Sequence, residues 1–167
     1  TAKAAVYDPS DGTFLEVAPL QTARLFHTAA KLGDGRVVIA GGTGEALVWD
    51  VETAHPFPIV PTQPVSAVEV FDPATNMWTT GYSPMPTARG GPAACVLNGD
   101  LYVLGGDTGC GSYTAAVESY DPNGNAWTVR PSLPSARVSF GAGCVNGTLY
   151  AMGGQLGVAL DLHDAYD

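Results

Sequence analysis

Residue types that could do chemistry are few in this chain and do not gather. No two of the three histidines, His27, His55 and His163, have the spacing of ligands to one metal ion. The three cysteines form no CxxC pair, so the sequence predicts neither a zinc site nor a disulfide framework. Cys95 and Cys144 fall in corresponding apolar segments, and we interpret both as small core residues.

Carboxylates and glycines also fit structural roles better than catalytic ones. Asp8, Asp72 and Asp121 each precede a proline at a turn, which does not suggest the paired carboxylates of a glycosidase. The glycines of residues 41–44 are not followed by Gly-Lys-Ser/Thr, so they form no phosphate loop. We therefore predict no catalytic residue, no metal ligand and no cofactor, and expect that the chain is not an enzyme.

Composition limits the partners. With 7 basic and 16 acidic residues the formal net charge is -9, which opposes binding to nucleic acid. No apolar run is long enough to span a membrane. Only 14% of residues are charged, and 21 glycines and 13 prolines are spread along the chain, which favours short strands joined by tight turns.

The elements that position these residues recur along the chain. From Asp72 to Asp121 is 49 residues, from Arg89 to Arg137 is 48, and from Gly105 to Gly153 is 48. A period near 50 is typical of propellers, solenoids and arrays. A further copy lies upstream, with its landmarks at Tyr7-Asp8-Pro9, Phe14, Arg24 and Gly41-Gly42.

Each copy divides into four strands. A small-residue inner strand follows the arginine, and an Asn-Gly or Gly-Asp-Gly turn leads to a second strand that ends in Gly-Gly. The third strand ends before Asp-Pro, and the fourth begins at Trp or Phe. The predicted units are a half repeat at 1–18, a repeat at 24–82 with an insertion at 45–64, a repeat at 89–130 and an incomplete repeat at 137–167. Spacing does not decide whether 45–64 is an inserted hairpin or a junction across absent chain.

These residues resemble the kelch repeat family. The double glycines match its diglycine, and the recurring Tyr or Phe before Asp, with Trp78 and Trp127, matches its aromatic positions. The resemblance implies an all-β fold of kelch β-propeller blades, each a four-stranded antiparallel sheet, with about three blades present. Closing a ring then requires flanking blades or self-assembly.

The resemblance also sets the function hypotheses. The leading one is a non-catalytic scaffold for protein-protein interaction through inter-strand loops. The predicted partner contacts are His55, Phe57, Tyr113 and Gln155. Alternatives are a fragment of a kelch-propeller enzyme, an oxidase or carbohydrate-acting enzyme with its active residues outside this chain, and a structural subunit of a larger complex. Copper or iron bound stoichiometrically to the intact protein would favour the enzyme.

The ends of the chain limit what can be inferred about localisation. Thr1 opens within a repeat and Asp167 closes within another, so we interpret the sequence as an excerpt. A targeting segment would not be visible, and the compartment stays unknown, with the cytoplasm slightly favoured.

Overall fold

The computed structural model describes residues 2–44, 63–156 and 163–166, so most of the predicted insertion lies outside it. Every regular element in these ranges is a strand, and all named strand pairs are antiparallel. The predicted all-β fold is confirmed. None of the described residues belongs to a helix that could cross a membrane.

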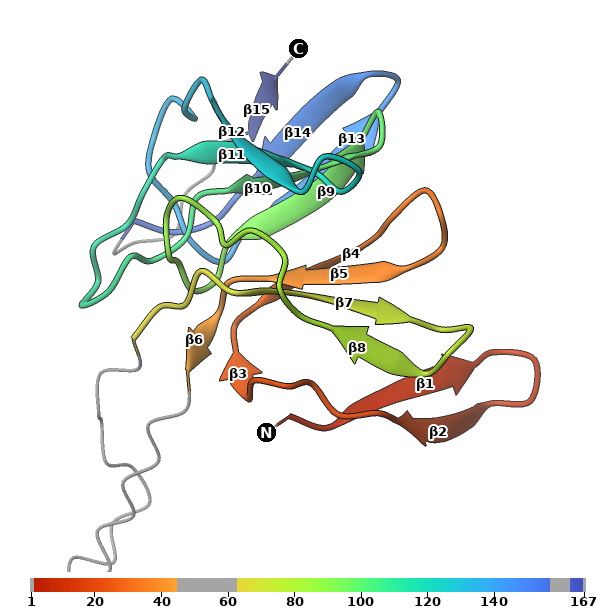
Figure 1. The fold of residues 1–167 in the computed structure, drawn as a ribbon. Helices are drawn as coiled ribbons and strands as arrows, with labels where there is room; N and C mark the ends of the chain where they lie inside the picture. Colours follow the sequence, from red (N-terminus) through yellow and green to blue (C-terminus); the bar gives the residue numbers. More distant parts are fainter. Residues whose placement is uncertain (1, 45–62, 157–162, 167) are drawn as a thin grey trace, which may run out of the picture.

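The strands form four main sheets that follow one another along the chain (Figure 1). The first pairs β1 (Ala4–Asp8) with β2 (Thr13–Val17). The second runs in the order β4 (Thr28–Lys31), β5 (Val37–Ala40), β7 (Val68–Asp72) and β8 (Met77–Thr79). The third has β9 (Ala93–Leu97), β10 (Asp100–Leu104), β11 (Val117–Asp121) and β12 (Ala126–Arg130). The fourth has β13 (Gly141–Val145), β14 (Thr148–Met152) and β15 (His163–Tyr166).

A fifth, two-stranded sheet was not predicted from the sequence. It pairs β3 (Arg24–Leu25) with β6 (Thr43–Gly44). These strands are only two residues long, so they carry no alternation of apolar and polar residues that a sequence could reveal.

The inner hairpins have the turn chemistry that their sequences predict. Asn98 and Gly99 have φ angles of 53° and 94°, and Asn146 and Gly147 have φ angles of 50° and 86°. Asparagine and glycine tolerate positive φ, and a two-residue turn of this kind matches the twist of the paired strands. The register of β9 with β10 and of β13 with β14 follows from these turns.

Small inner strands let the sheets approach one another. Strand β9 contacts both β4 and β13, so the innermost strands of three successive sheets lie next to one another. The core fills the space between sheets: Val38 and Val70 of one sheet pack with Leu101 and Tyr120 of the next. A second cluster, which includes Leu104, Val117, Leu149 and Ala151, joins the third sheet to the fourth.

The outer strand of each full sheet is fastened to the chain segment that precedes that repeat. Trp78 Nε1 donates to Ala18 O at 2.7 Å, and Trp127 Nε1 donates to Ser83 O at 2.7 Å. Asn125 Oδ1 accepts from Ser83 N at 2.7 Å, as Asn76 Oδ1 does from Ala18 N at 3.0 Å. The tryptophan of the repeat motif therefore joins neighbouring repeats, and its ring also packs on the aromatic ring of the third strand, Phe71 or Tyr120.

A disulfide corrects the interpretation of two cysteines as separate core residues. Cys95 in β9 is bonded to Cys144 in β13, with their Cα atoms 5.9 Å apart. The expectation of no disulfide was wrong because it considered motifs and cysteine parity only. The two positions are 49 residues apart, one repeat period, and side-by-side stacking of repeats brings equivalent inner-strand positions together.

Candidate functional site

A buried arginine begins the connection into each repeat and fixes it to the sheet. Arg24 pairs with Glu69 (Nη2 to Oε1, 2.5 Å), and Arg89 pairs with Glu118 (Nη2 to Oε2, 2.5 Å). Arg137 pairs in the same way with Asp164. Burial lowers the pKa of Arg89, and the Glu118 carboxylate opposes that shift. The three arginines are therefore framework residues, and the carboxylate partner of each one lies in the third strand of its own repeat.

The same arginines join each sheet to the next through the diglycine. Arg89 Nη1 donates to Gly105 O at 3.0 Å within its own repeat, while its backbone carbonyl accepts from Gly42 N of the preceding repeat at 2.9 Å. A Cβ on Gly105 would lie 2.6 Å from the carbonyl oxygen of Arg137. The first glycine is therefore required by the close approach of the next repeat's backbone.

The residue after each diglycine pairs with the residue after each arginine. Gly90 and Asp107 exchange two backbone hydrogen bonds of 2.8 and 2.7 Å, and Val138 and Gln155 exchange two of 3.1 and 3.0 Å. Thr43 opposite Leu25 is the counterpart in the first full repeat. The repeats thus place Thr43, Asp107 and Gln155 at one equivalent position.

The next residue in each connection has a left-handed backbone and links neighbouring repeats. Phe26, Gly91 and Ser139 have φ angles of 52°, 61° and 56°. Gly91 N donates to Phe26 O at 2.8 Å, and Ser139 N donates to Gly91 O at 3.3 Å. Backbone hydrogen bonds therefore link three successive repeats at this end of the strands.

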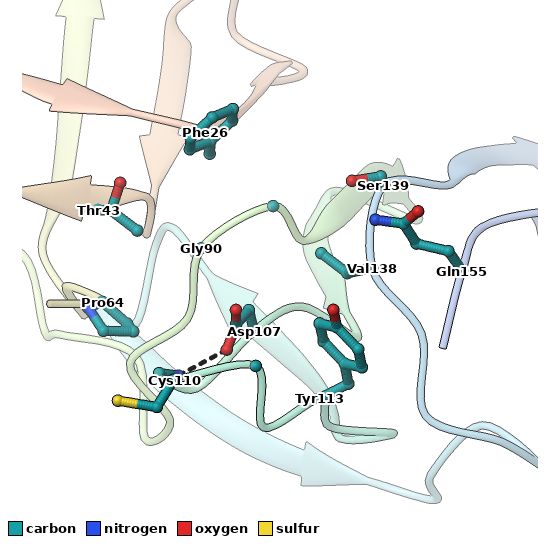
Figure 2. A pocket seen from close by; sticks show the side chains of 13 residues that line it. Phe26, Thr43, Pro64, Gly90, Asp107, Cys110, Tyr113, Val138, Ser139 and Gln155 are labelled. Carbon is teal, nitrogen blue, oxygen red and sulfur yellow. Dashed lines mark hydrogen bonds between the residues drawn. The ribbon is translucent and has the colours of Figure 1, made fainter. Parts of the chain in front are cut away.

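These equivalent positions surround a cavity of about 470 Å³, which we call the loop-face cavity (Figure 2). It opens at the end of the strands where the connections between repeats lie, together with the loops between the second and third strands of each repeat. Described residues from three repeats line it: Phe26, Thr43, Pro64, Gly90, Gly91, Asp107, Gly109, Cys110, Gly111, Tyr113, Val138, Ser139 and Gln155.

The loop after β10 supplies one wall of the cavity and is held by its own hydrogen bonds. Asp107 Oδ1 accepts from Gly109 N at 2.7 Å, and Thr108 N donates to Ser112 O at 2.8 Å. Tyr113 forms a β-bridge with Asp107. The loop therefore holds Tyr113 and the Asp107 carboxylate at the same cavity.

Two of the four predicted partner contacts meet at this site. Tyr113 and Gln155 are 42 residues apart in sequence and line the same cavity. His55 and Phe57 lie outside the described residues. Sequence reasoning missed Asp107, Thr43 and Phe26, although their position relative to Arg and Gly-Gly in each repeat could have identified them.

A second cavity, of about 680 Å³, lies between the β1–β2 hairpin and the second sheet. Apolar side chains such as Val6, Ile39 and Phe71 line much of it. On the same hairpin Phe14 is 74% exposed and Leu15 is 70% exposed. The hairpin therefore carries apolar surface that no described residue covers.

Among the described residues, no three His, Cys, Asp or Glu side chains are grouped so that they could hold one metal ion. His27 is exposed next to β4 and lines the second cavity. Partial burial and the charge of Arg24 lower its pKa.

Four-stranded antiparallel sheets that stack through their inner strands define the blades of a β-propeller. The fold agrees with the solved structure of YjhT, with a TM-score of 0.74 at 17% identity, over 92% of this chain and 51% of that one. A kelch motif model matches residues 88–134. The chain belongs to the kelch-repeat family.

Curated relatives support the same family assignment. Kelch-like protein 25 of Xenopus tropicalis is 30% identical over 129 residues, 77% of this chain and 20% of that protein. Kelch repeat and BTB domain-containing protein 12 of Danio rerio is 30% identical over 130 residues, 74% of this chain and 19% of that protein. The chain thus spans about a fifth of the length of these relatives.

Proposed function

We propose that this chain is a non-catalytic kelch-repeat scaffold that holds a protein partner at the loop-face cavity. One observation carries the proposal: the residues that join the repeats are the same in each repeat, whereas the residues that line the cavity differ. Each repeat has the same arginine and glycine at its joint, whereas the residue after the diglycine is Thr43, Asp107 or Gln155. Varied side chains on a constant framework are typical of recognition surfaces.

The cavity has the dimensions and lining of a binding site. Its volume of about 470 Å³ lies within the usual range for pockets, and it combines apolar groups with a few polar ones. Tyr113 adds an aromatic ring with a hydroxyl group, a residue type enriched at protein interfaces. His55 and Phe57, which lie outside the described residues, remain proposed contacts.

A displayed peptide library selected on the immobilised chain tests the proposal. We expect enriched peptides whose binding is weakened by Tyr113→Ala and by Gln155→Ala. Asn123→Ala is the matched control. Asn123 is exposed in the turn between β11 and β12, which lies at the opposite end of the strands of the third blade. Equal loss with the control variant, or no enriched peptide, would contradict a loop-face scaffold.

Assembly is the second part of the proposal. The uncovered apolar side chains of the β1–β2 hairpin are suited to packing against another blade, supplied either by a flanking segment or by a second copy of the chain. Val6 of the same hairpin is 46% exposed and also lines the second cavity.

A further inference from the structure

The loop-face cavity carries one uncompensated charge. Asp107 is the only charged side chain among the described residues that line it, and it is half-buried. The nearby arginines Arg24, Arg89 and Arg137 are fully buried and are each paired with a carboxylate. The whole chain has a net charge of -9. The electrostatic preference of this cavity is therefore for a cation.

Several backbone amides of the cavity lining already donate hydrogen bonds within the protein and are not free to bind an anion. The Asp107 carboxylate itself accepts the N–H of Gly109 at 2.7 Å. The lining residues whose amides donate to protein carbonyls are Gly90, Gly91, Asp107, Val138, Ser139 and Gln155. An acidic ligand would therefore meet the Asp107 carboxylate here, and these amides could not offset the repulsion.

Two aromatic side chains, Phe26 and Tyr113, line the same cavity as Asp107. Phe26 is 70% exposed although it lines the cavity, and Tyr113 lies close to Asp107 on another wall (Figure 2). Phe26 keeps a left-handed backbone, with φ of 52°, at the position where the next repeat has a glycine. A flat cation between these groups could meet the carboxylate with its edge and an aromatic ring with its face.

We propose that the loop-face cavity binds an arginine side chain from an extended segment of a partner protein. The guanidinium contacts the Asp107 carboxylate, and its plane and methylene groups pack on Phe26 and Tyr113. Arginine is favoured over lysine because its planar group stacks on aromatic rings and donates several fixed hydrogen bonds to a carboxylate. This inference rests on the proposed function and specifies the partner's chemistry.

The test uses the full chain and a library of random peptides, followed by resynthesis of the enriched sequences. Asp107→Asn removes the charge but keeps an oxygen that can accept the Gly109 amide, so the loop retains its turn. Asp121→Asn is the matched control. Asp121 is also half-buried, and its Oδ1 accepts a hydrogen bond from Asn123 N at 2.8 Å. It lies at the opposite end of the strands of the same blade. In the peptides, citrulline replaces arginine with a neutral group of similar shape.

We expect arginine to be enriched, and Asp107→Asn to weaken binding about tenfold or more. Citrulline should weaken binding to the unaltered chain by a similar factor and should have little further effect on the Asp107→Asn variant. Asp121→Asn should change the dissociation constant by less than about twofold.

Other outcomes separate this inference from the proposed function. Enriched peptides without arginine, or arginine peptides that bind equally to the Asp107→Asn variant, would overturn the arginine site. If those peptides still lose binding with Tyr113→Ala, the scaffold proposal stands. A library that yields no binder overturns both. Because citrulline alters only the peptide, the arginine contact is tested even if a protein variant fails to fold.

Discussion

Glu118 Oε2 lies 2.5 Å from Arg89 Nη2, and both side chains are almost completely withdrawn from solvent, at 2% and 0% exposure. The Glu118 carboxylate also accepts a hydrogen bond from Thr87 Oγ1 at 2.7 Å. Glutamate in the third strand of the blade therefore holds both the arginine and the connection that leads to it.

Replacing Glu118 with glutamine leaves the Arg89 charge buried without its counter-ion. We expect Glu118→Gln to lower the free energy of unfolding by about 3 kcal/mol or more, measured by urea denaturation. Glu16→Gln is the control, because the Lys3–Glu16 pair of 3.2 Å is exposed, and its urea midpoint should hardly change. Equal midpoints for the two variants would argue against a structural role for the buried pair.

Asn125 joins two blades through its side chain and has φ of 50°. Asn125→Gly keeps that backbone but removes the contacts of Oδ1 with Ser83 N and the Tyr120 hydroxyl, so we expect a loss of about 1–3 kcal/mol. Gly12 is the equivalent position in the first half blade, and a Cβ there would meet nothing within 4 Å. Gly12→Asn should therefore leave the thermal midpoint nearly unchanged, and a large loss there would contradict this comparison.

The Cys95–Cys144 disulfide closes a loop across two blades. Its two cysteines are 49 positions apart in sequence, and for a loop of this length chain entropy predicts a stabilisation of about 4 kcal/mol relative to the reduced chain. The Cys95→Ala/Cys144→Ala double variant should unfold at a lower urea concentration and lose its sensitivity to reductant. Thiol counting should find one reactive cysteine, Cys110, in the native chain. Three reactive thiols before reduction would show that the bond is absent.

The disulfide also has a consequence for localisation. Disulfide bonds persist in oxidising compartments and are rare in the cytosol. We therefore expect the natural protein to be oxidised at this pair in an extracytosolic compartment, in place of the cytoplasm that was slightly favoured before the disulfide was seen. Alkylation of the protein in cell extracts before and after reduction measures this directly.

Tyr120 should make stability depend on pH in the alkaline range. Its ring is fully buried, and burial together with the neighbouring Tyr82 raises its pKa to about 12. Between about pH 10 and 12 the unfolded chain loses this proton while the folded chain keeps it, so stability falls as pH rises. The free energy of unfolding should decline less steeply in Tyr120→Phe, and parallel declines would contradict the assignment.

Exposed side chains on the first hairpin should promote association of residues 1–167. Phe14 and Leu15 present apolar surface on β2. We expect the sedimentation coefficient to rise with concentration and the Phe14→Ser variant to reduce this rise. Met77→Ser is the control, since Met77 is 62% exposed on the outer strand of the next blade. Identical behaviour of all three chains would contradict association through the hairpin.

Much of the blade could be predicted from sequence because its determinants are local. Asn98-Gly99 specifies a turn, and the Asp-Pro pairs that follow Phe71 and Tyr120 mark the end of the third strand. The Cys95–Cys144 bond and the Trp127–Ser83 hydrogen bond join positions nearly one repeat apart. Comparing repeats shows that such positions are equivalent, but only the stacking of blades shows which of them touch.

The candidate site was harder to predict for a different reason. Tyr113 and Gln155 were expected to contact a partner because they lie in loops, but their place around one cavity depends on backbone hydrogen bonds of Gly90, Asp107 and Val138. Any residue with a free amide and carbonyl can make these bonds, so side-chain patterns do not encode them.

The joint between Gly106 and Arg137 has a consequence for how such a chain can change in length. Gly106 N donates to Arg137 O at 2.9 Å, and Gly42 N meets Arg89 O in the same way. Each repeat therefore carries a donor for its successor and an acceptor for its predecessor. A gene duplication that copied one whole period would insert a blade already equipped with both ends of this coupling, and its new neighbours would need no compensating substitution there.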